Sequence, residues 1–238
     1  MIENNYTKCY IAFMDILGFK KMVSNRSFED ILKIYENIKN PIRTAYVGDE
    51  NNKAREVETM KAVKSKVMSD SICFYVEANL PNSLFCLIMC CASFQAKLVS
   101  LPDPVFIRGG ITAGEIYVGG DKVFGPGLVE AYQLEEKNAK YPRIIIRKST
   151  LDCGQNGVDE LLHNVWSQIL FEDFDAFYSL NYYGLLNNFE KSETVYKNLM
   201  QTISKQLSEE IDDSIRQKYL YIRKKLKLCC SQGEKPNA

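Results

Sequence analysis

Apolar and polar positions alternate along the first part of the chain in a way that predicts short strands and amphipathic helices. Residues 8–15 form an apolar run of β-forming side chains that ends in an aspartate, which predicts a buried strand. Ser27 and Asp30 have the spacing of a helix N-terminal capping pair, and the pattern that follows predicts a helix to about Asn40. Residues 48–58 are mostly polar and indicate a loop.

The next part of the chain has the pattern of a hairpin, a buried helix, and a further helix between two strands. Residues 61–77 predict two strands joined by a tight turn at Ser69–Asp70–Ser71. Residues 81–101 are apolar on almost every side, which predicts a helix buried all round. Residues 104–118 predict a strand, and residues 119–121 predict a turn. Residues 126–138 predict a helix with proline in its first turn, and residues 143–147 predict a further strand. This order predicts an α+β sandwich with helices on one face of a mostly antiparallel sheet.

The pattern changes after about residue 150. We therefore expect a first domain at 1–150, a helical extension at 151–230 and a disordered tail at 231–238. Residues 151–160 are typical of a loop, and residues 192–228 are mostly helical. Between them lies an acidic and aromatic cluster, which we expect to pack against the first domain rather than to form a second site. The cluster consists of Phe171, Asp173, Phe174, Asp175, Phe177, Tyr178, Tyr182 and Tyr183.

Charge and hydropathy argue against two classes of partner. The 238 residues include 30 Lys and Arg against 30 Asp and Glu, with a sequence pI of about 6.6. Balanced charge argues against a broad basic surface, so we expect no nucleic-acid partner. The longest apolar stretch, 83–94, is shorter than the roughly 20 residues of a membrane-spanning helix, and the N-terminus has no apolar signal segment. We therefore expect a cytoplasmic protein with no membrane partner.

The cysteines and the single histidine offer little for nucleophilic or metal chemistry. The eight cysteines contain no C-x-x-C pair, so we expect most of them to be small core residues in a reducing compartment. We expect His163 to be structural, because little around it in the sequence suggests a nucleophilic site. Any chemistry therefore depends on carboxylates, lysines, arginines and bound metal ions.

Two aspartates are the first candidates for that chemistry. Asp15 ends the first strand, and Gly18 lets the following backbone bend around a phosphate, with Lys20 and Lys21 adding positive charge. A simple turn explains these residues equally well. Asp70 lies at a hairpin tip, where a Ser-Asp-Ser turn is also common. A hairpin packed beside the first strand would bring both carboxylates to one edge and create an oxygen site for magnesium or manganese with a triphosphate.

Arg108 is the third candidate, at the start of the segment Arg108–Gly114. An arginine in the sheet of a neutral protein needs a partner, and either a phosphate or the pair of Asp15 and Asp70 would serve. A structural salt bridge is an equally good explanation.

Together these segments resemble the catalytic domain of class III nucleotide cyclases. The resemblance covers about residues 8–148 and depends on the order of YIAFMDILGF (10–19), KVMSDSICF (66–74), FIRGGITAG (106–114) and VFGPGLVEAYQLE (123–135). Within that superfamily, these motifs and the AKYPRIII that follows them are most similar to the bacterial cyclases of the Pycsar anti-phage systems, which make cyclic UMP or cyclic CMP. The resemblance implies a class III cyclase-like sandwich with a C-terminal helical extension.

The resemblance also implies a metal site and a reaction. Asp15 and Asp70 would bind two divalent ions, Mn²⁺ or Mg²⁺, and the carbonyl of Ile16 would complete one of the two sites. The ribose 3′-hydroxyl would attack the α-phosphorus in line, and the ions would activate the hydroxyl and neutralise the leaving pyrophosphate.

The nucleotide-binding residues are implied in the same way. The backbone of Leu17, Gly18 and Phe19 would hold the β- and γ-phosphates. Lys66 falls where purine cyclases have a base-contacting lysine, and Arg108 would lie close to the active site.

The sequence departs from the purine cyclases on the helix at 126–138. The asparagine and arginine that orient ribose and stabilise the transition state in those enzymes align with Val129 and Gln133. Their base-reading aspartate aligns with Lys122, next to Asp121. Arg108 is our candidate for supplying the missing positive charge, and the identity of the base stays open.

We therefore expect a cyclase that converts UTP or CTP to the 3′,5′-cyclic monophosphate as the second-messenger synthase of an anti-phage system. The resemblance implies a homodimer with active sites at the interface and a separate effector protein that reads the product. The alternatives are a purine cyclase, a nucleotide sensor without turnover, and a nucleotide polymerase on a related palm fold. The last is suggested only by the common turn sequence Gly119–Gly120–Asp121.

Overall fold

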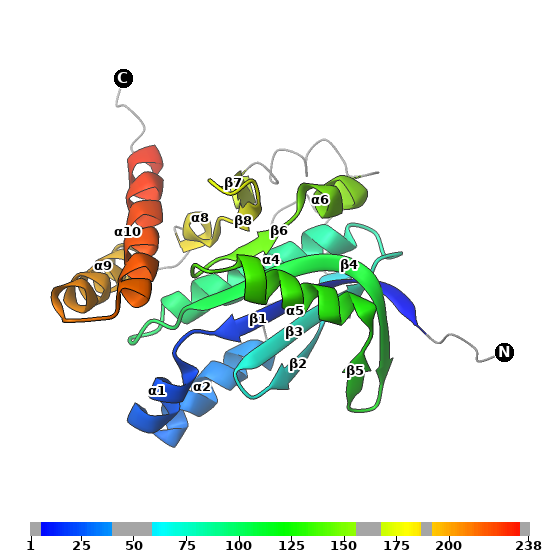
Figure 1. Cartoon of the computed structure of the whole chain (residues 1–238), viewed down its shortest axis with the longest axis horizontal. Coiled ribbons are helices and arrows are strands. Elements are labelled where there is room, and N and C mark those ends of the chain that lie inside the picture. Colours follow the sequence, from blue (N-terminus) through cyan, green and yellow to red (C-terminus); the bar gives the residue numbers. More distant parts are fainter. Residues whose placement is uncertain (1–5, 40–58, 156–167, 187–191, 234–238) are drawn as a thin grey trace.

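A computed structural model describes residues 6–39, 59–155, 168–186 and 192–233 (Figure 1). The loop predicted at 48–58 and His163 lie outside these residues. Most of the tail predicted at 231–238 also lies outside them, although the last helix continues to Gly233.

The centre of the molecule is an eight-stranded sheet in the order β2-β3-β1-β4-β6-β8-β7, with β5 paired to β4 (Figure 1). The strands are β1 (Thr7–Ile16), β2 (Lys64–Met68), β3 (Ser71–Glu77), β4 (Ile107–Gly119), β5 (Lys122–Phe124), β6 (Ile144–Ile146), β7 (Leu170–Glu172) and β8 (Tyr178–Leu180). β1 is antiparallel to both β3 and β4, and among the described strand pairs only β4 and β6 are parallel. The mostly antiparallel sheet predicted from the sequence is confirmed.

Helices cover both faces of this sheet. They are α1 (Phe19–Asn25), α2 (Phe28–Lys39), α4 (Ser83–Val99), α5 (Pro126–Asn138), α6 (Lys148–Gln155), α8 (Tyr182–Leu186), α9 (Ser192–Ser208) and α10 (Asp213–Gly233). Side chains of β1 alternate between the faces: Tyr10 and Met14 join the large core around α4, whereas Ile11 and Phe13 join Ala131 of α5. The prediction of helices on one face is therefore wrong. α5 lies on the other face because it connects β4 to β6, which are parallel and need a crossover helix.

α5 packs unusually close to β4. A Cβ atom on Gly114 of the strand would lie only 2.5 Å from the Cα atom of Gly127 on the helix. Thr112 donates a hydrogen bond from its hydroxyl to the Gly127 carbonyl at 3.2 Å. These contacts fix the helix against the strand that carries Arg108.

The signals that predicted α2 and α4 are present in the structure. The Asp30 amide donates a hydrogen bond to Ser27 Oγ (3.2 Å), and the Ser27 hydroxyl donates one to the Asp30 carboxylate (2.8 Å), which caps α2. Nearly every side chain of α4 is buried, as its apolar sequence predicts. Five cysteines are buried and form no disulfide, which confirms their expected core role: Cys9, Cys73, Cys86, Cys90 and Cys91. No described helix is long and apolar enough to cross a membrane.

The chain after residue 150 contributes strands as well as helices. α6 occupies the beginning of the segment predicted as a loop, where Leu151 is buried and Lys148 forms an i,i+4 ion pair with Asp152 at 2.8 Å. β7 and β8 were not predicted and extend the sheet beyond β6. Each has three residues, which is too short for a period of two to be visible in the sequence.

The acidic cluster packs against the beginning of β6 and against α10. Arg143 is 1% exposed and donates hydrogen bonds to Asp173 at 2.7 Å and to Asp175 at 3.1 Å. From α10, the Tyr221 hydroxyl donates a hydrogen bond to Asp173 at 2.6 Å, and the Lys225 ammonium lies 3.4 Å from the same carboxylate. Tyr182, Tyr183 and Asp173 of the cluster are buried, whereas Phe174 is 71% exposed.

Candidate functional site

The candidate site begins at the C-terminal end of β1, on the sheet face that α5 covers. Asp15 pairs across the sheet with Arg108 of β4 on one side and with Ser71 of β3 on the other. Its side chain is 22% exposed, and its Oδ2 atom lies 3.4 Å from Arg108 Nε. The sheet register therefore brings together the first aspartate and the arginine that the sequence singled out.

Asp70 reaches the same edge through the turn between β2 and β3. The Ile16 amide donates a hydrogen bond to the Asp70 carbonyl at 3.0 Å, and the Tyr35 hydroxyl of α2 donates one to the neighbouring Ser69 carbonyl at 2.8 Å. Burial raises the pKa of Asp15, the nearby Asp70 carboxylate raises it further, and Arg108 opposes both effects. The backbone hydrogen bond thus places Asp70 at the edge of the sheet where β1 ends.

The turn after Asp15 has the shape that its glycine predicts. Gly18 has a φ angle of 72°, in the left-handed region that favours glycine. The Leu17 amide donates a hydrogen bond to the Phe106 carbonyl at 2.9 Å, which ties the turn to the segment before β4. The backbone between β1 and α1 is therefore ordered next to the two aspartates.

Glu135 of α5 is the residue that the sequence analysis missed. It is 2% exposed, and its Oε1 atom lies 2.7 Å from Arg108 Nε. The pKa of Glu135 is raised to about 7. Burial is the main cause and the Asp15 carboxylate adds to it, whereas Arg108 acts in the opposite direction. A sequence signal was available, because Glu135 follows Ala131 by four residues and therefore shares the core-facing side of the helix.

Lys66 is on β2, which β3 separates from the strand of Asp15, and its side chain contacts the tip of the β4–β5 hairpin. Its ammonium donates a hydrogen bond to the Gly120 carbonyl at 3.3 Å and lies 3.5 Å from the Asp121 carboxylate. Val129 and Gln133, which occupy the positions of the missing asparagine and arginine, are exposed on the outer side of α5. Among the described residues, no hydrogen bond or ion pair joins Lys66 and Asp121 to Asp15 and Arg108.

The oxygen atoms near Asp15 suit a hard divalent cation. Asp15 and Asp70 supply carboxylates, and the Ile16 carbonyl belongs to the same chain segment. In the parts of the chain that the structure describes, no three His, Cys, Asp or Glu side chains converge as a metal site. The two carboxylates would therefore need further oxygen ligands, which the phosphates of a nucleotide provide.

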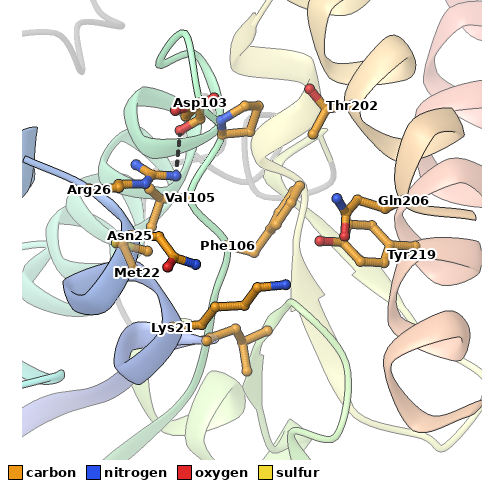
Figure 2. Close-up of a pocket in the computed structure, with 13 residues that line it drawn as sticks. Lys21, Met22, Asn25, Arg26, Asp103, Val105, Phe106, Thr202, Gln206 and Tyr219 are labelled. Atoms are coloured by element: carbon orange, nitrogen blue, oxygen red, sulfur yellow. Dashed lines mark hydrogen bonds between the residues drawn. The ribbon is translucent and has the colours of Figure 1, made fainter. Parts of the chain in front are cut away.

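A cleft of about 280 Å³ lies behind the Leu17–Gly18 turn. Figure 2 shows Lys21 and Asn25 of α1 pointing into it, with Gln206 of α9 and Tyr219 of α10 on the opposite wall. The C-terminal helices therefore face the turn directly, although Asp15 and Arg108 do not line this cleft.

Comparison with known proteins identifies the fold. No protein-family model and no curated protein sequence matches the chain. Among solved structures, it is similar to the monomeric guanylyl cyclase domain of the RhoGC fusion protein from the aquatic fungus Blastocladiella emersonii. The identity is 15% and the TM-score 0.51, over 74% of this chain and 95% of that one. A double mutant of the same domain matches at 15% identity and a TM-score of 0.50, with the same coverage. The chain thus has the fold of class III nucleotide cyclases, as the sequence predicted.

Proposed function

We propose that this chain is a metal-dependent nucleotide cyclase that converts UTP or CTP to the 3′,5′-cyclic monophosphate and pyrophosphate. The main support is the group formed by Asp15, Asp70 and Arg108 beside the Leu17–Gly18 turn on a cyclase fold. The pyrimidine base and a role as second-messenger synthase in bacterial anti-phage defence are supported by the resemblance of the sequence motifs.

The residues of this group match the needs of the reaction. The ribose 3′-oxygen forms a bond to the α-phosphorus, and the bond to the leaving pyrophosphate breaks, so negative charge develops on phosphate oxygens. Two divalent ions held by Asp15, Asp70 and the Ile16 carbonyl would supply Lewis-acid chemistry at these oxygens. Arg108 would bind phosphate oxygens, and the backbone of Leu17, Gly18 and Phe19 would hold the β- and γ-phosphates.

Lys66 and Asp121 are our candidates for contacting the base. The ammonium donates hydrogen bonds and the carboxylate accepts them, and the two groups lie 3.5 Å apart. Such a pair matches the donor and acceptor on the Watson–Crick edge of a pyrimidine. The exposed Val129 and Gln133 support a catalytic arrangement different from that of the purine cyclases.

A homodimer would complete the site by bringing Lys66 and Asp121 of one copy to Asp15 and Arg108 of the other, since no contact joins these two pairs among the described residues of one copy. Large hydrophobic side chains are exposed on α5, on the β4–β5 hairpin and at the end of β2, and a second copy would cover them. These residues are Met68, Val118, Phe124, Val129 and Tyr132. A separate effector protein would then read the cyclic product.

The test is direct measurement of the product. The purified chain is incubated with Mn²⁺ and each of the four ribonucleoside triphosphates separately, and the products are resolved by chromatography with mass detection. Asp70→Ala should abolish the product. Asp152→Asn, which changes an exposed aspartate of α6, is the matched control and should retain it.

Each outcome selects one function. A cyclic pyrimidine monophosphate that depends on Asp70 would support the proposal and identify the base. A cyclic purine product would retain the cyclase and reject the pyrimidine assignment. Metal-dependent triphosphate binding without product would favour a sensor, in line with the absence of the asparagine and arginine at 129 and 133. A product with two nucleotides would indicate a polymerase.

A further inference from the structure

We propose that the cleft behind the Leu17–Gly18 turn is a second small-molecule site, which binds a nucleoside monophosphate. The site lies between α1 and the C-terminal helices α9 and α10, and neither Asp15 nor Arg108 lines it. The inference concerns binding alone, so it does not depend on the proposed cyclase reaction.

The cleft has an apolar floor and an aromatic wall that suit a flat ligand. Met22, Val105 and Phe106 line it and are buried. The rings of Phe106 and Tyr219 lie 6.0 Å apart at an interplanar angle of 88°, and a planar base can stack on such a wall. The volume of about 280 Å³ is close to the lower end of the roughly 300–1,000 Å³ of small-molecule sites, which fits one nucleotide rather than two.

Positive charge on the α1 side of the cleft favours an anion. Lys21 forms no hydrogen bond or ion pair with any described residue, and Figure 2 shows its side chain extending across the cleft toward Tyr219. Arg26 donates one hydrogen bond to the Asp103 carbonyl at 3.3 Å. The two cations face the single carboxylate of Asp103 among the lining residues, so the lining is net positive and suits a phosphate group.

Side-chain amides supply the hydrogen bonds that a base requires. Asn25 of α1 and Gln206 of α9 lie on opposite walls, and each has both a donor and an acceptor (Figure 2). Neither amide forms a hydrogen bond with a described residue. An amide can pair with a donor and an acceptor on the edge of a base at the same time, so these groups favour a nucleotide over a simple anion.

The helical extension is needed to form this site. Thr202 and Gln206 of α9 and Tyr219 of α10 make up one wall of the cleft. Phe106, whose carbonyl accepts the Leu17 amide at 2.9 Å, packs against Tyr219. A bound nucleotide would therefore contact both the turn after Asp15 and the extension, which gives the extension a role in ligand binding.

The test is calorimetry with UMP in the absence of metal ions. UMP should bind at submillimolar concentration, whereas uridine, which lacks the anion, and inorganic phosphate, which lacks the ring, should each bind about tenfold more weakly or worse. Gln206→Glu keeps the shape but adds a negative charge to the cleft, so UMP affinity should fall by about tenfold or more. Gln201→Glu makes the same change at an exposed position of α9 outside the cleft and should retain affinity.

Two further variants locate the bound nucleotide. Lys21→Gln removes a cation from the opposite wall and should also weaken UMP binding, which tests the site independently of α9. Asp70→Ala should leave UMP binding unchanged, because Asp70 does not line the cleft. If UMP binds in this way but no triphosphate yields a cyclic product, the inference holds and the cyclase proposal fails.

Three results would overturn the inference. Loss of UMP binding in Asp70→Ala with retention in Gln206→Glu would place the nucleotide at the candidate active site. Uridine or inorganic phosphate binding as tightly as UMP would reject the ligand class. The absence of UMP binding to the wild-type chain at millimolar concentration would reject the site itself.

Discussion

Backbone hydrogen bonds, rather than side-chain contacts, hold the candidate metal ligands Asp15 and Asp70 in position relative to each other. Asp15 lies within the β1 register, and the Asp70 carbonyl accepts the Ile16 amide at 3.0 Å. Either carboxylate can therefore be replaced without moving the other. Asp70→Ala is therefore informative about chemistry, because the backbone carbonyl that ties residue 70 to Ile16 is retained.

At the scale of single residues, the backbone conformation of Gly18 predicts the effect of replacing it. Its φ angle is 72°, and a Cβ atom there would meet nothing within 4 Å, so Gly18→Ala should cause backbone strain without a clash. The strain should lower stability by about 1 kcal/mol and shift the turn that we assign to the phosphates. Calorimetry should then show weaker binding of Mn²⁺–tripolyphosphate.

Gly120→Ala is the matched control for this prediction. Gly120 has a φ angle of 56° and is equally open, so its substitution should cause similar strain at the β4–β5 turn. It should lower the midpoint of thermal unfolding but leave tripolyphosphate affinity unchanged. Equal affinity losses in both variants would mean that Gly18 acts only through stability.

At the scale of elements, a buried ionic cluster attaches α10 to the sheet. Burial raises the pKa of Asp173, but hydrogen bonds from Tyr221, the Phe174 amide and Arg143 lower it more, to about 2 from 3.8. A carboxylate whose pKa is lower in the folded state stabilises the fold at pH values above 3.8. That contribution is lost as the pH falls from 3.8 through about 2.

Asp173→Asn should therefore lower the free energy of unfolding at pH 7 by ~2 kcal/mol, since each unit of pKa shift corresponds to about 1.4 kcal/mol. The loss should shrink as the pH falls from 3.8 and disappear below about pH 2, where wild-type Asp173 is also protonated. Urea unfolding at a series of pH values measures both effects. Glu172→Gln alters the exposed neighbour and should leave the curve unchanged. A loss that is independent of pH would assign the effect to packing.

Elements with long or repeated patterns were predictable from the sequence, and elements defined by distant contacts were not. β1, the hairpin of β2 and β3, α4 and α5 have clear alternation or helical periodicity, and their order indicated the sheet. β7 and β8 are short and form only because the sheet edge at β6 offers them partners. Asp15, Asp70 and Arg108 could be grouped from the motifs, whereas Glu135 is defined by how α5 crosses β4.

At the scale of the whole molecule, the separation of the two candidate groups predicts complementation. Lys66→Ala and Asp70→Ala should each be inactive alone, because each homodimer lacks one half of both sites. After the two variants are mixed and allowed to exchange subunits, about a quarter of the sites should contain both intact halves. Cyclase activity should then recover to about that fraction of wild type.

Two results would contradict this arrangement. No recovery, with exchange demonstrated by mass-tagged subunits, would place both groups in one copy of the chain. Activity that does not change with dilution of the wild-type protein below the dimer dissociation range would argue against a shared site.

The contact between Gly114 and Gly127 has a consequence for the variation that the protein can tolerate. Two residues without side chains set the separation between the strand of Arg108 and the helix of Glu135, although neither is among the candidate site residues. Any larger residue would push the helix away from the strand and separate the ion pair. These two positions should therefore accept as little substitution as the aspartates themselves, for a reason that is purely one of space.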